Sequence, residues 1–353
     1  MITSDQISVV IQGALGTDVL ACVRSIRQQL PQSELILSTW EGSNVPAGLP
    51  VDECIFSADP GAQPADRKGQ VLNNTNRQLV STLAGLRRAT RPHALKIRTD
   101  FELSGSGFLT AFDSTQRRDE RFVHYRRKLV IPHYSTRFPD AARPFPFHPS
   151  DISLFGLTED LIRHFDVPLI EGKDWNWAEH HLAEIPIERQ HDLYLPQFAP
   201  EQHFFVHSLK LHGHDIPMRH YHDCHGDIPE QSRRFMANNF VILDMADFGI
   251  RTKKAALAYA IAKDTANCYS HLLYRIEYRQ WCDPQAELSW REKLEARLAR
   301  RKKIHERLLK HRFAMRQHAA LIFSTSEEGW FTHCHKMLAD GLSTFYYFMR
   351  AVA

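Results

Sequence analysis

The chain has 353 residues, of which 43% are hydrophobic and 24% are charged, and its formal net charge is +3. This composition is typical of a globular protein with a sizeable core and argues against long disordered stretches. The first residues lack the basic and apolar regions of a secretory signal, and no run reaches the roughly 20 apolar residues that a membrane-spanning helix needs. We therefore expect a cytoplasmic protein.

The first hundred residues alternate between strand and helix patterns. Short β-branched or apolar runs predict strands at residues 7–12, 34–39, 53–56 and 94–98. Apolar residues at helical spacing predict helices at residues 17–30 and 73–89. This order predicts an α/β fold with a mainly parallel sheet flanked by helices. Ligands bind such a sheet where its strands end, so the loops after the strands should share one rim.

The remainder of the chain is less regular. Residues 103–240 are rich in Pro, His and aromatic residues and predict irregular structure, whereas the chain from residue 251 onward looks mostly helical. We therefore expect an α/β domain over residues 1–255 and a helical extension over residues 256–353. Residues 291–316 hold 11 Lys or Arg and 3 Asp or Glu, a local net charge of +8. This segment predicts either contact with an anionic partner or a solvated cationic helix face.

Two acids follow the last predicted strand of the sheet. Asp100 and Glu102 stand one residue apart where this strand breaks into a loop. Both can approach one hard cation, because Mg²⁺ and Mn²⁺ prefer oxygen ligands and Mg²⁺ often bridges one or two carboxylates to substrate phosphates. The alternative is a pair of solvated loop carboxylates. Within the strand, Lys96 and Arg98 alternate with apolar residues, so either Arg98 pairs with an acid and orients the site or the strand has one solvated face.

Amide and cationic groups near the same rim can hold phosphates. Asn73, Asn74, Asn76 and Arg77 cluster at the start of the second predicted helix, where backbone N–H groups favour anions. Simple helix capping would explain only part of this cluster. Lys68, in the preceding loop, would add positive charge.

Candidates for acid–base and metal chemistry also lie in the irregular region. Asp174 and Glu201 can each act as a general base or hydrogen-bond a sugar. His, Cys and Asp residues crowd residues 212–225, but their spacing matches no standard zinc motif. His222 from this group can complete a Mn²⁺ shell, and ordinary surface histidines are the alternative. The chain has no P-loop and no dinucleotide-binding glycine motif, which argues against a kinase or a dehydrogenase.

Several short motifs, taken in order, resemble those of one protein family. They are spread over roughly residues 5–255 and read ISVVIQG, ELILSTWEG, DPG, NN with NRQ, ALKIRTD, FG, PEQ and NNFVI. In this order they resemble the WavE lipopolysaccharide synthesis family. A series of ordered motifs is more specific than any one of them.

The resemblance implies a glycosyltransferase of bacterial surface-polysaccharide synthesis with a GT-A-like fold. In that fold, the loop after the first strand and the acid near the end of the second hold the nucleotide, which implies this role for Gln12, Gly13 and Glu41. The acidic motif after the fourth strand holds the metal, which implies that Asp100 and Glu102 bind Mn²⁺ or Mg²⁺.

These inferences together predict one reaction. The enzyme would transfer a sugar from a nucleoside diphospho-sugar, held also by Lys68, Asn73, Arg77 and Arg98, to a saccharide or lipid-linked saccharide acceptor. The basic residues 291–316 would contact the inner face of the membrane peripherally. One alternative is a non-catalytic scaffold with a nucleotide-sugar fold. Another is a nucleic-acid-binding protein that uses the basic helix, but this function leaves the acidic motif without a role, so we expect no nucleic acid.

Overall fold

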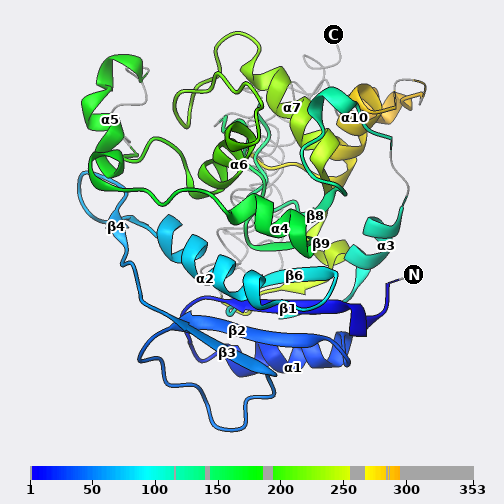
Figure 1. Ribbon diagram of the computed structural model, residues 1–353. Coiled ribbons are helices and arrows are strands. Elements are labelled where there is room, and N and C mark those ends of the chain that lie inside the picture. The colour runs from blue at the N-terminus through cyan, green and yellow to red at the C-terminus, as the bar shows by residue number, and fades with distance from the viewer. Residues whose placement is uncertain are drawn as a thin grey trace, which may run out of the picture.

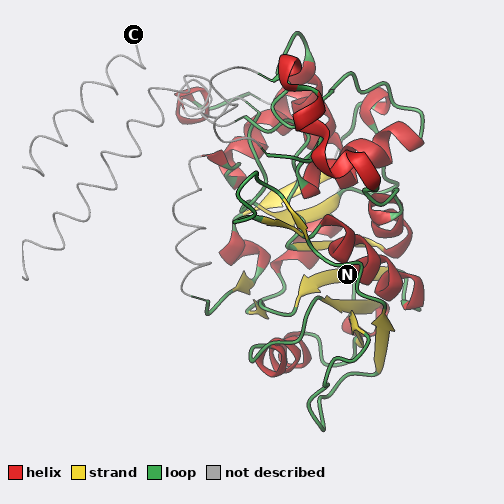
Figure 2. Ribbon diagram, turned by 90° about the vertical axis from the view of Figure 1, so that its left-hand side faces the viewer, coloured by secondary structure: helices red, strands yellow, loops and turns green. Residues whose placement is uncertain are grey.

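The computed structural model describes residues 2–114, 117–139, 144–185, 194–254, 267–283, 285 and 287–294. Over these residues the chain forms a mixed α/β structure in which helices flank a central sheet (Figures 1 and 2). The predicted α/β class and the mainly parallel sheet are therefore confirmed.

The central sheet has seven strands in the order β3-β2-β1-β6-β9-β8-β10. In chain order they are Ile7–Gln12 (β1), Glu34–Trp40 (β2), Glu53–Ser57 (β3), His93–Arg98 (β6), Leu129–Pro132 (β8), Ser153–Leu157 (β9) and Phe240–Leu243 (β10). Neighbouring strands run parallel except at β9, which is antiparallel to both β6 and β8. The strands predicted from the first hundred residues are β1, β2, β3 and β6.

The longer helices are α1 (Val19–Gln29), α2 (Thr75–Arg88), α4 (Thr158–Phe165), α6 (Pro200–Leu211), α7 (Ile228–Asn239) and α10 (His271–Trp281). The first two are the predicted helices. Helix α2 packs on β1 and β2, and it approaches the sheet closely because it carries Gly85. A Cβ at this position would lie 2.4 Å from Val10 Cγ1.

Shorter elements shape the edges of the molecule. The short strands are β4 (Gln63–Pro64), β5 (Leu72–Asn73), β7 (Glu102–Leu103) and β11 (Ile250–Arg251). The short α-helices are α3 (Gly107–Asp113), α5 (Trp177–His180) and α8 (Met245–Phe248). Single 3₁₀ turns occur at Ser4–Gln6, Glu120–Phe122, Gly172–Asn176 and Leu182–Glu184. Strands β4 and β5 pair with each other, and so do β7 and β11.

The main core fills the space between the sheet and its helices. Every residue of β1 is buried, which is expected for a parallel strand that is covered on both faces. The aromatic residues Phe108, Phe112 and Phe155 pack together within this core. These contacts join β9, which carries Phe155, to helix α3, which carries Phe108 and Phe112.

The region 103–240 is more regular than its sequence predicts. It supplies β8 and β9 to the sheet and α4, α6 and α7 to the layers around it. The prediction of irregular structure is wrong here because these strands have four or five residues, too few to show a clear period. The Pro-rich residues 144–149 do form a loop, as expected.

Helix α10 lies beyond the expected domain boundary at residue 255 and packs against α7 and β10. Tyr269, Leu273 and Tyr274 are buried in the main core. The division into residues 1–255 and 256–353 stays a prediction. The basic segment 291–316 lies outside the described residues, apart from 291–294.

Within the ranges that the structure describes, no helix is both long enough and apolar enough to span a bilayer.

Candidate functional site

The turns that follow the parallel strands lie side by side and form one rim, as the predicted sheet requires. The Gly13 N–H donates to the Ser38 carbonyl at 3.2 Å, and the Thr99 N–H donates to the Gln12 carbonyl at 3.1 Å. Gly13 adopts φ +126°, a conformation that L side chains rarely take, and a Cβ there would lie 3.4 Å from Thr99 Oγ1. This position therefore favours glycine.

The antiparallel strand β9 brings further polar groups to the same rim. Its register pairs Ser153 with Ile97 near the end of β6, so Asp151 lies just beyond that end. The Lys96 side chain is fully buried and donates to the backbone carbonyl of Asp151. Burial lowers the pKa of Lys96 to about 8 and raises the pKa of Asp151. The alternative of a solvated face on this strand is thus wrong at Lys96.

Glu201, in the first turn of α6, is the centre of a hydrogen-bonded cluster. The Ser135 hydroxyl donates to Glu201 Oε1 at 2.6 Å, and His148 Nε2 lies 3.4 Å from Glu201 Oε2. Burial lowers the pKa of His148 to about 3, so its ring is neutral at pH 7. Because its Nδ1–H donates to the Ser135 carbonyl at 2.8 Å, the unprotonated Nε2 faces the Glu201 carboxyl group.

The protonation of Glu201 follows from these surroundings. Burial raises the pKa of Glu201, although the Ser135 hydroxyl and the positive charge of Arg98 act in the opposite direction. A proton on Glu201 can be shared with His148 Nε2. A carboxyl group with a raised pKa beside a neutral imidazole is a better proton acceptor than an exposed glutamate.

Two residues near the cluster have left-handed backbone conformations that are uncommon outside glycine. Ser135 has φ 63° and Phe147 has φ 55°. Such conformations cost roughly 1–3 kcal/mol each and persist only where the surroundings hold them. The Phe147 N–H is held by the Ser232 hydroxyl at 2.7 Å. The unusual conformations thus occur at Ser135 and directly before His148, the two residues that contact Glu201.

The structure brings several predicted site residues into this neighbourhood. Arg98, at the end of β6, interacts electrostatically with both Asp151 and Glu201. Asn73 donates to the Tyr194 hydroxyl at 2.8 Å, and the pKa of Tyr194 is raised by burial and by the charge of Glu201. Predicted donor residues from two parts of the chain thus lie around the predicted base.

The acidic motif is paired with protein cations. Arg98 contacts both carboxylate oxygens of Asp100, at 2.9 and 2.7 Å, which confirms that Arg98 pairs with an acid. Lys254 contacts the Oδ2 of Asp100 at 3.2 Å. Glu102 Oε2 accepts from Arg251 at 2.8 Å, and Glu102 Oε1 lies 2.6 Å from Lys253 Nζ. The alternative of two solvated carboxylates is wrong, because their side chains are only 12% and 9% exposed.

The predicted metal ligands do not gather into one site. The His222 ring Nδ1–H donates to the Pro144 carbonyl at 3.0 Å. Within the described part of the chain, no three His, Cys, Asp or Glu side chains form a group that could hold a metal ion. Each of the four oxygens of Asp100 and Glu102 already contacts a cationic side chain, so these oxygens do not fit Mn²⁺ or Mg²⁺ unless an ion pair breaks.

Two further donor-binding candidates have partners of their own. Arg77 makes a bidentate ion pair with Asp59, at 2.7 and 2.6 Å, on the loop after β3. Gln12 is buried, and its amide donates to the Ser81 hydroxyl of α2 at 2.9 Å. The Gln12 side chain therefore supports α2 against the sheet in this arrangement.

The remaining candidates, Glu41, Lys68 and Asp174, are exposed and lie on three separate segments. Glu41 directly follows β2, and Lys68 lies in the turn between β4 and β5. Asp174 lies in the 3₁₀ helix Gly172–Asn176. Among the described residues, no hydrogen bond or ion pair joins their side chains to the Glu201 cluster. Their roles stay predictions.

The histidines of residues 212–225 disperse into several environments. His212 and His214 each pack against His124, with ring centroids 5.3 Å apart. His225 instead pairs with the buried Asp223 at 2.9 Å. The crowding in sequence therefore produces separate packing contacts.

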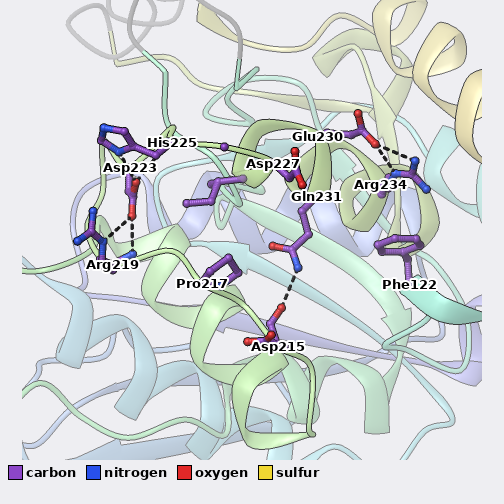
Figure 3. A pocket seen from close by; sticks show the side chains of 12 residues that line it. Phe122, Asp215, Pro217, Arg219, Asp223, His225, Asp227, Glu230, Gln231 and Arg234 are labelled. Carbon is purple, nitrogen blue, oxygen red and sulfur yellow. Dashed lines mark hydrogen bonds and ion pairs between the residues drawn. The ribbon is translucent and has the colours of Figure 1, made fainter.

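A pocket of about 610 Å³, lined mainly by charged and polar residues, lies beside residues 215–227 and the start of α7. Figure 3 shows Asp223 between Arg219 and His225, and Arg234 facing Glu230 across a 2.8 Å ion pair. None of the predicted donor or metal residues lines this pocket.

Sequence reasoning missed Ser135, His148 and Asp151. The available signal was the polar pair Ser150-Asp151 directly before an apolar run. For a parallel strand these residues would lie at the opposite edge of the sheet from the rim. Only the reversal of β9 moves them to the site.

A sequence comparison now gives the family. The pattern of the WavE lipopolysaccharide synthesis family matches residues 7–313, so the chain belongs to this family. The predicted resemblance is confirmed and reaches beyond residue 255. Membership supports the predicted class, a glycosyltransferase that acts in lipopolysaccharide synthesis. No curated protein matches the chain.

Solved structures of glycosyltransferases resemble parts of the chain. The galactosyltransferase LgtC, in complex with donor and acceptor sugar analogs, has 13% identity and a TM-score of 0.29, over 57% of this chain and 70% of that chain. The glycosyltransferase GlyE of Streptococcus pneumoniae TIGR4 has 9% identity and a TM-score of 0.27, over 58% and 42%. An active-site mutant of LgtC has 13% identity and a TM-score of 0.27, over 51% and 66%. TM-scores this low add no argument to the fold.

Proposed function

We propose that the protein transfers a sugar from a nucleoside diphospho-sugar to a saccharide acceptor in lipopolysaccharide synthesis. The observation that carries the proposal is Glu201, whose side chain is only 12% exposed and whose pKa is raised, at the rim where the parallel strands end. Such rims bind nucleotides in α/β sheets. A buried acid beside that position can remove the proton of an acceptor hydroxyl.

In an inverting transfer, the acceptor oxygen forms a bond to the anomeric carbon as the bond from that carbon to the diphosphate breaks. The electron pair leaves with the nucleoside diphosphate, and the acceptor proton passes to Glu201. His148 and Ser135 position the carboxyl group, and Arg98 supplies positive charge nearby. In a retaining transfer a base is not required in the same form, and the configuration of the product separates the two routes.

The predicted Mn²⁺ or Mg²⁺ stays a prediction. Such an ion would act as a Lewis acid on the departing diphosphate. To bind Asp100 or Glu102 it would first have to displace Arg98, Arg251 or one of the two lysines. No step above depends on it.

The acceptor would bind in the pocket beside α7 and extend from it toward Glu201, which does not itself line the pocket. The carboxylates and guanidinium groups that line it can hydrogen-bond sugar hydroxyls. The loop that forms its wall is attached to the start of α6, since Gln202, next to Glu201, donates to the Tyr221 carbonyl at 3.0 Å. A lipid-linked acceptor would agree with peripheral membrane contact through residues 291–316, which stays a prediction.

Thermal unfolding with UDP-, GDP-, dTDP- and CMP-sugars, each with Mn²⁺ and with EDTA, tests the donor. A ligand that binds the native state raises its melting temperature by mass action. We expect a shift with one of the UDP-, GDP- or dTDP-sugars, and release of its nucleoside diphosphate when a lipopolysaccharide oligosaccharide is added. The CMP-sugars, which would release CMP, serve as the control. Glu201→Gln should keep the shift and lose about 10²- to 10⁴-fold in turnover. No shift with any donor would favour the scaffold alternative.

A further inference from the structure

A short basic segment, residues 251–254, runs alongside the acidic motif at the rim. It reads Arg-Thr-Lys-Lys, and it supplies three of the four cations that contact the motif. Lys254 also lies 3.8 Å from Asp18, at the start of α1 beside the Gly13 turn. We name residues 251–254 the cationic segment.

The backbone fixes the position of the cationic segment independently of its ion pairs. Strand β11 pairs with β7, so that Arg251 stands opposite Glu102. Immediately before β11, Gly249 adopts φ +96°, and a Cβ there would lie 2.5 Å from the Gly105 carbonyl. The Ser104 N–H donates to the Gly249 carbonyl at 2.7 Å. The strand register therefore holds Arg251 at the rim. The residues after it are held by Thr252, whose hydroxyl donates to the Asp100 carbonyl at 3.2 Å and accepts from the Lys254 N–H at 3.2 Å.

The cations lie outside the carboxylates. The side chains of Arg251, Lys253 and Lys254 are 62%, 66% and 48% exposed, whereas those of Asp100 and Glu102 are 12% and 9% exposed. A ligand that arrives from solvent meets the ammonium and guanidinium groups first. These groups repel a divalent cation and attract a phosphate.

The net charge of this ion-pair network is also positive. Within the network of direct ion pairs, the four cations Arg98, Arg251, Lys253 and Lys254 stand against the three acids Asp18, Asp100 and Glu102. The difference is 4 − 3 = +1 before any ion binds. Asp100 and Glu102 do not require a metal for neutralisation, because their ion pairs supply it.

We propose that Lys253 and Lys254 bind the diphosphate of the donor directly and take the part otherwise expected of a divalent metal. The inference rests on the proposed function and names the groups that recognise the donor. Asp100 and Glu102 then act as positioning residues, which hold the lysines at the ends of β1 and β6. The lysines offset the negative charge that the nucleoside diphosphate gains as the sugar leaves.

The test is calorimetric titration of UDP, GDP, CDP and dTDP into the full chain in the presence of EDTA. We expect one of them to bind, and Lys253→Ala and Lys254→Ala each to weaken its Kd about tenfold or more, since each removes a charge-assisted contact. Lys254→Arg keeps the charge and should stay within a few-fold of wild type. Arg87→Ala is the matched control, because Arg87 is an exposed ion-paired cation in the last turn of α2.

Binding that appears only when Mn²⁺ or Mg²⁺ replaces EDTA would overturn this inference and leave the proposed function intact. Wild-type affinity in both alanine variants would do the same. If neither these four nucleotides nor ADP binds with or without metal, the proposed function fails, and the inference fails with it. Melting temperatures of each variant separate loss of binding from loss of fold.

Discussion

At the scale of single residues, the main feature is the largely buried carboxyl group of Glu201, whose pKa is shifted in opposite directions by burial and by its neighbours. Burial raises the pKa of Glu201, and the hydrogen bond from Ser135 lowers it. If the ionised form is the base, activity is present above this pKa and is lost as the pH falls through it. The acidic limb of kcat/KM should thus lie above the value near 4.3 that an exposed glutamate shows.

We expect Ser135→Ala to move this acidic limb to higher pH. The substitution removes the hydroxyl that stabilises the ionised carboxylate of Glu201. Alanine, like serine, carries a Cβ, so the strain of the left-handed backbone at residue 135 stays about the same in the variant as in wild type. The pH profile of kcat/KM measures the change. A purely structural role for Ser135 would lower activity without moving the limb, and that outcome would contradict the assigned positioning role.

A second residue-scale prediction concerns Lys96. Burial lowers its pKa from 10.5 to about 8, so between these values the unfolded chain binds more protons than the native one. Stability therefore contains a component that rises with pH across this window. Relative to wild type, Lys96→Met should lose that rise in melting temperature between pH 8 and pH 10. Lys68→Met, at an exposed lysine, is the control and should follow the wild-type curve.

At the scale of elements, the turn before β11 determines where the cationic segment lies. We expect Gly249→Ala to destabilise the protein by roughly 2 to 4 kcal/mol, because a Cβ in this left-handed conformation collides with the backbone at Gly105. Urea unfolding measures this loss. Gly16→Ala, with no atom within 4 Å of its added Cβ, should remain close to wild type. Equal stability of the two variants would show that the turn can rearrange.

Some of the strands could be predicted from the sequence pattern, and others could not. Strands β1, β2, β3 and β6 were predictable because β-branched runs alternate with two amphipathic helices. Their order also predicted the shared rim. Strand β9 was not predictable, since a five-residue strand with only three large apolar side chains gives no sign of its direction. Direction alone decides that Asp151 reaches the site and is not at the far edge.

At the scale of the whole molecule, the core continues past the predicted domain boundary. The Phe138 N–H donates to the Asn267 carbonyl at 3.0 Å, and the Tyr269 N–H donates to the Thr136 carbonyl at 2.8 Å. We expect a chain that ends at residue 255 to melt several degrees below a chain that ends at residue 294, because loss of α10 exposes the surfaces of α7 and β10 against which it packs. Equal melting temperatures would instead support a boundary at residue 255.

The sequence by itself determined the α/β class, the parallel strands with their rim and the family, and it selected Arg98, Asp100 and Glu201 as candidates for the site. These follow from local periodicity and from ordered motifs, which need no knowledge of distant contacts. The tertiary structure alone decided what those residues touch. It places residues 251–254 beside the acidic motif, where Arg251 contacts Glu102 across 149 residues of the sequence. It also joins Ser135 and His148 to Glu201, and the contact from Ser135 spans 66 residues. Such pairings depend on strand direction and packing, and no local pattern in the sequence encodes them.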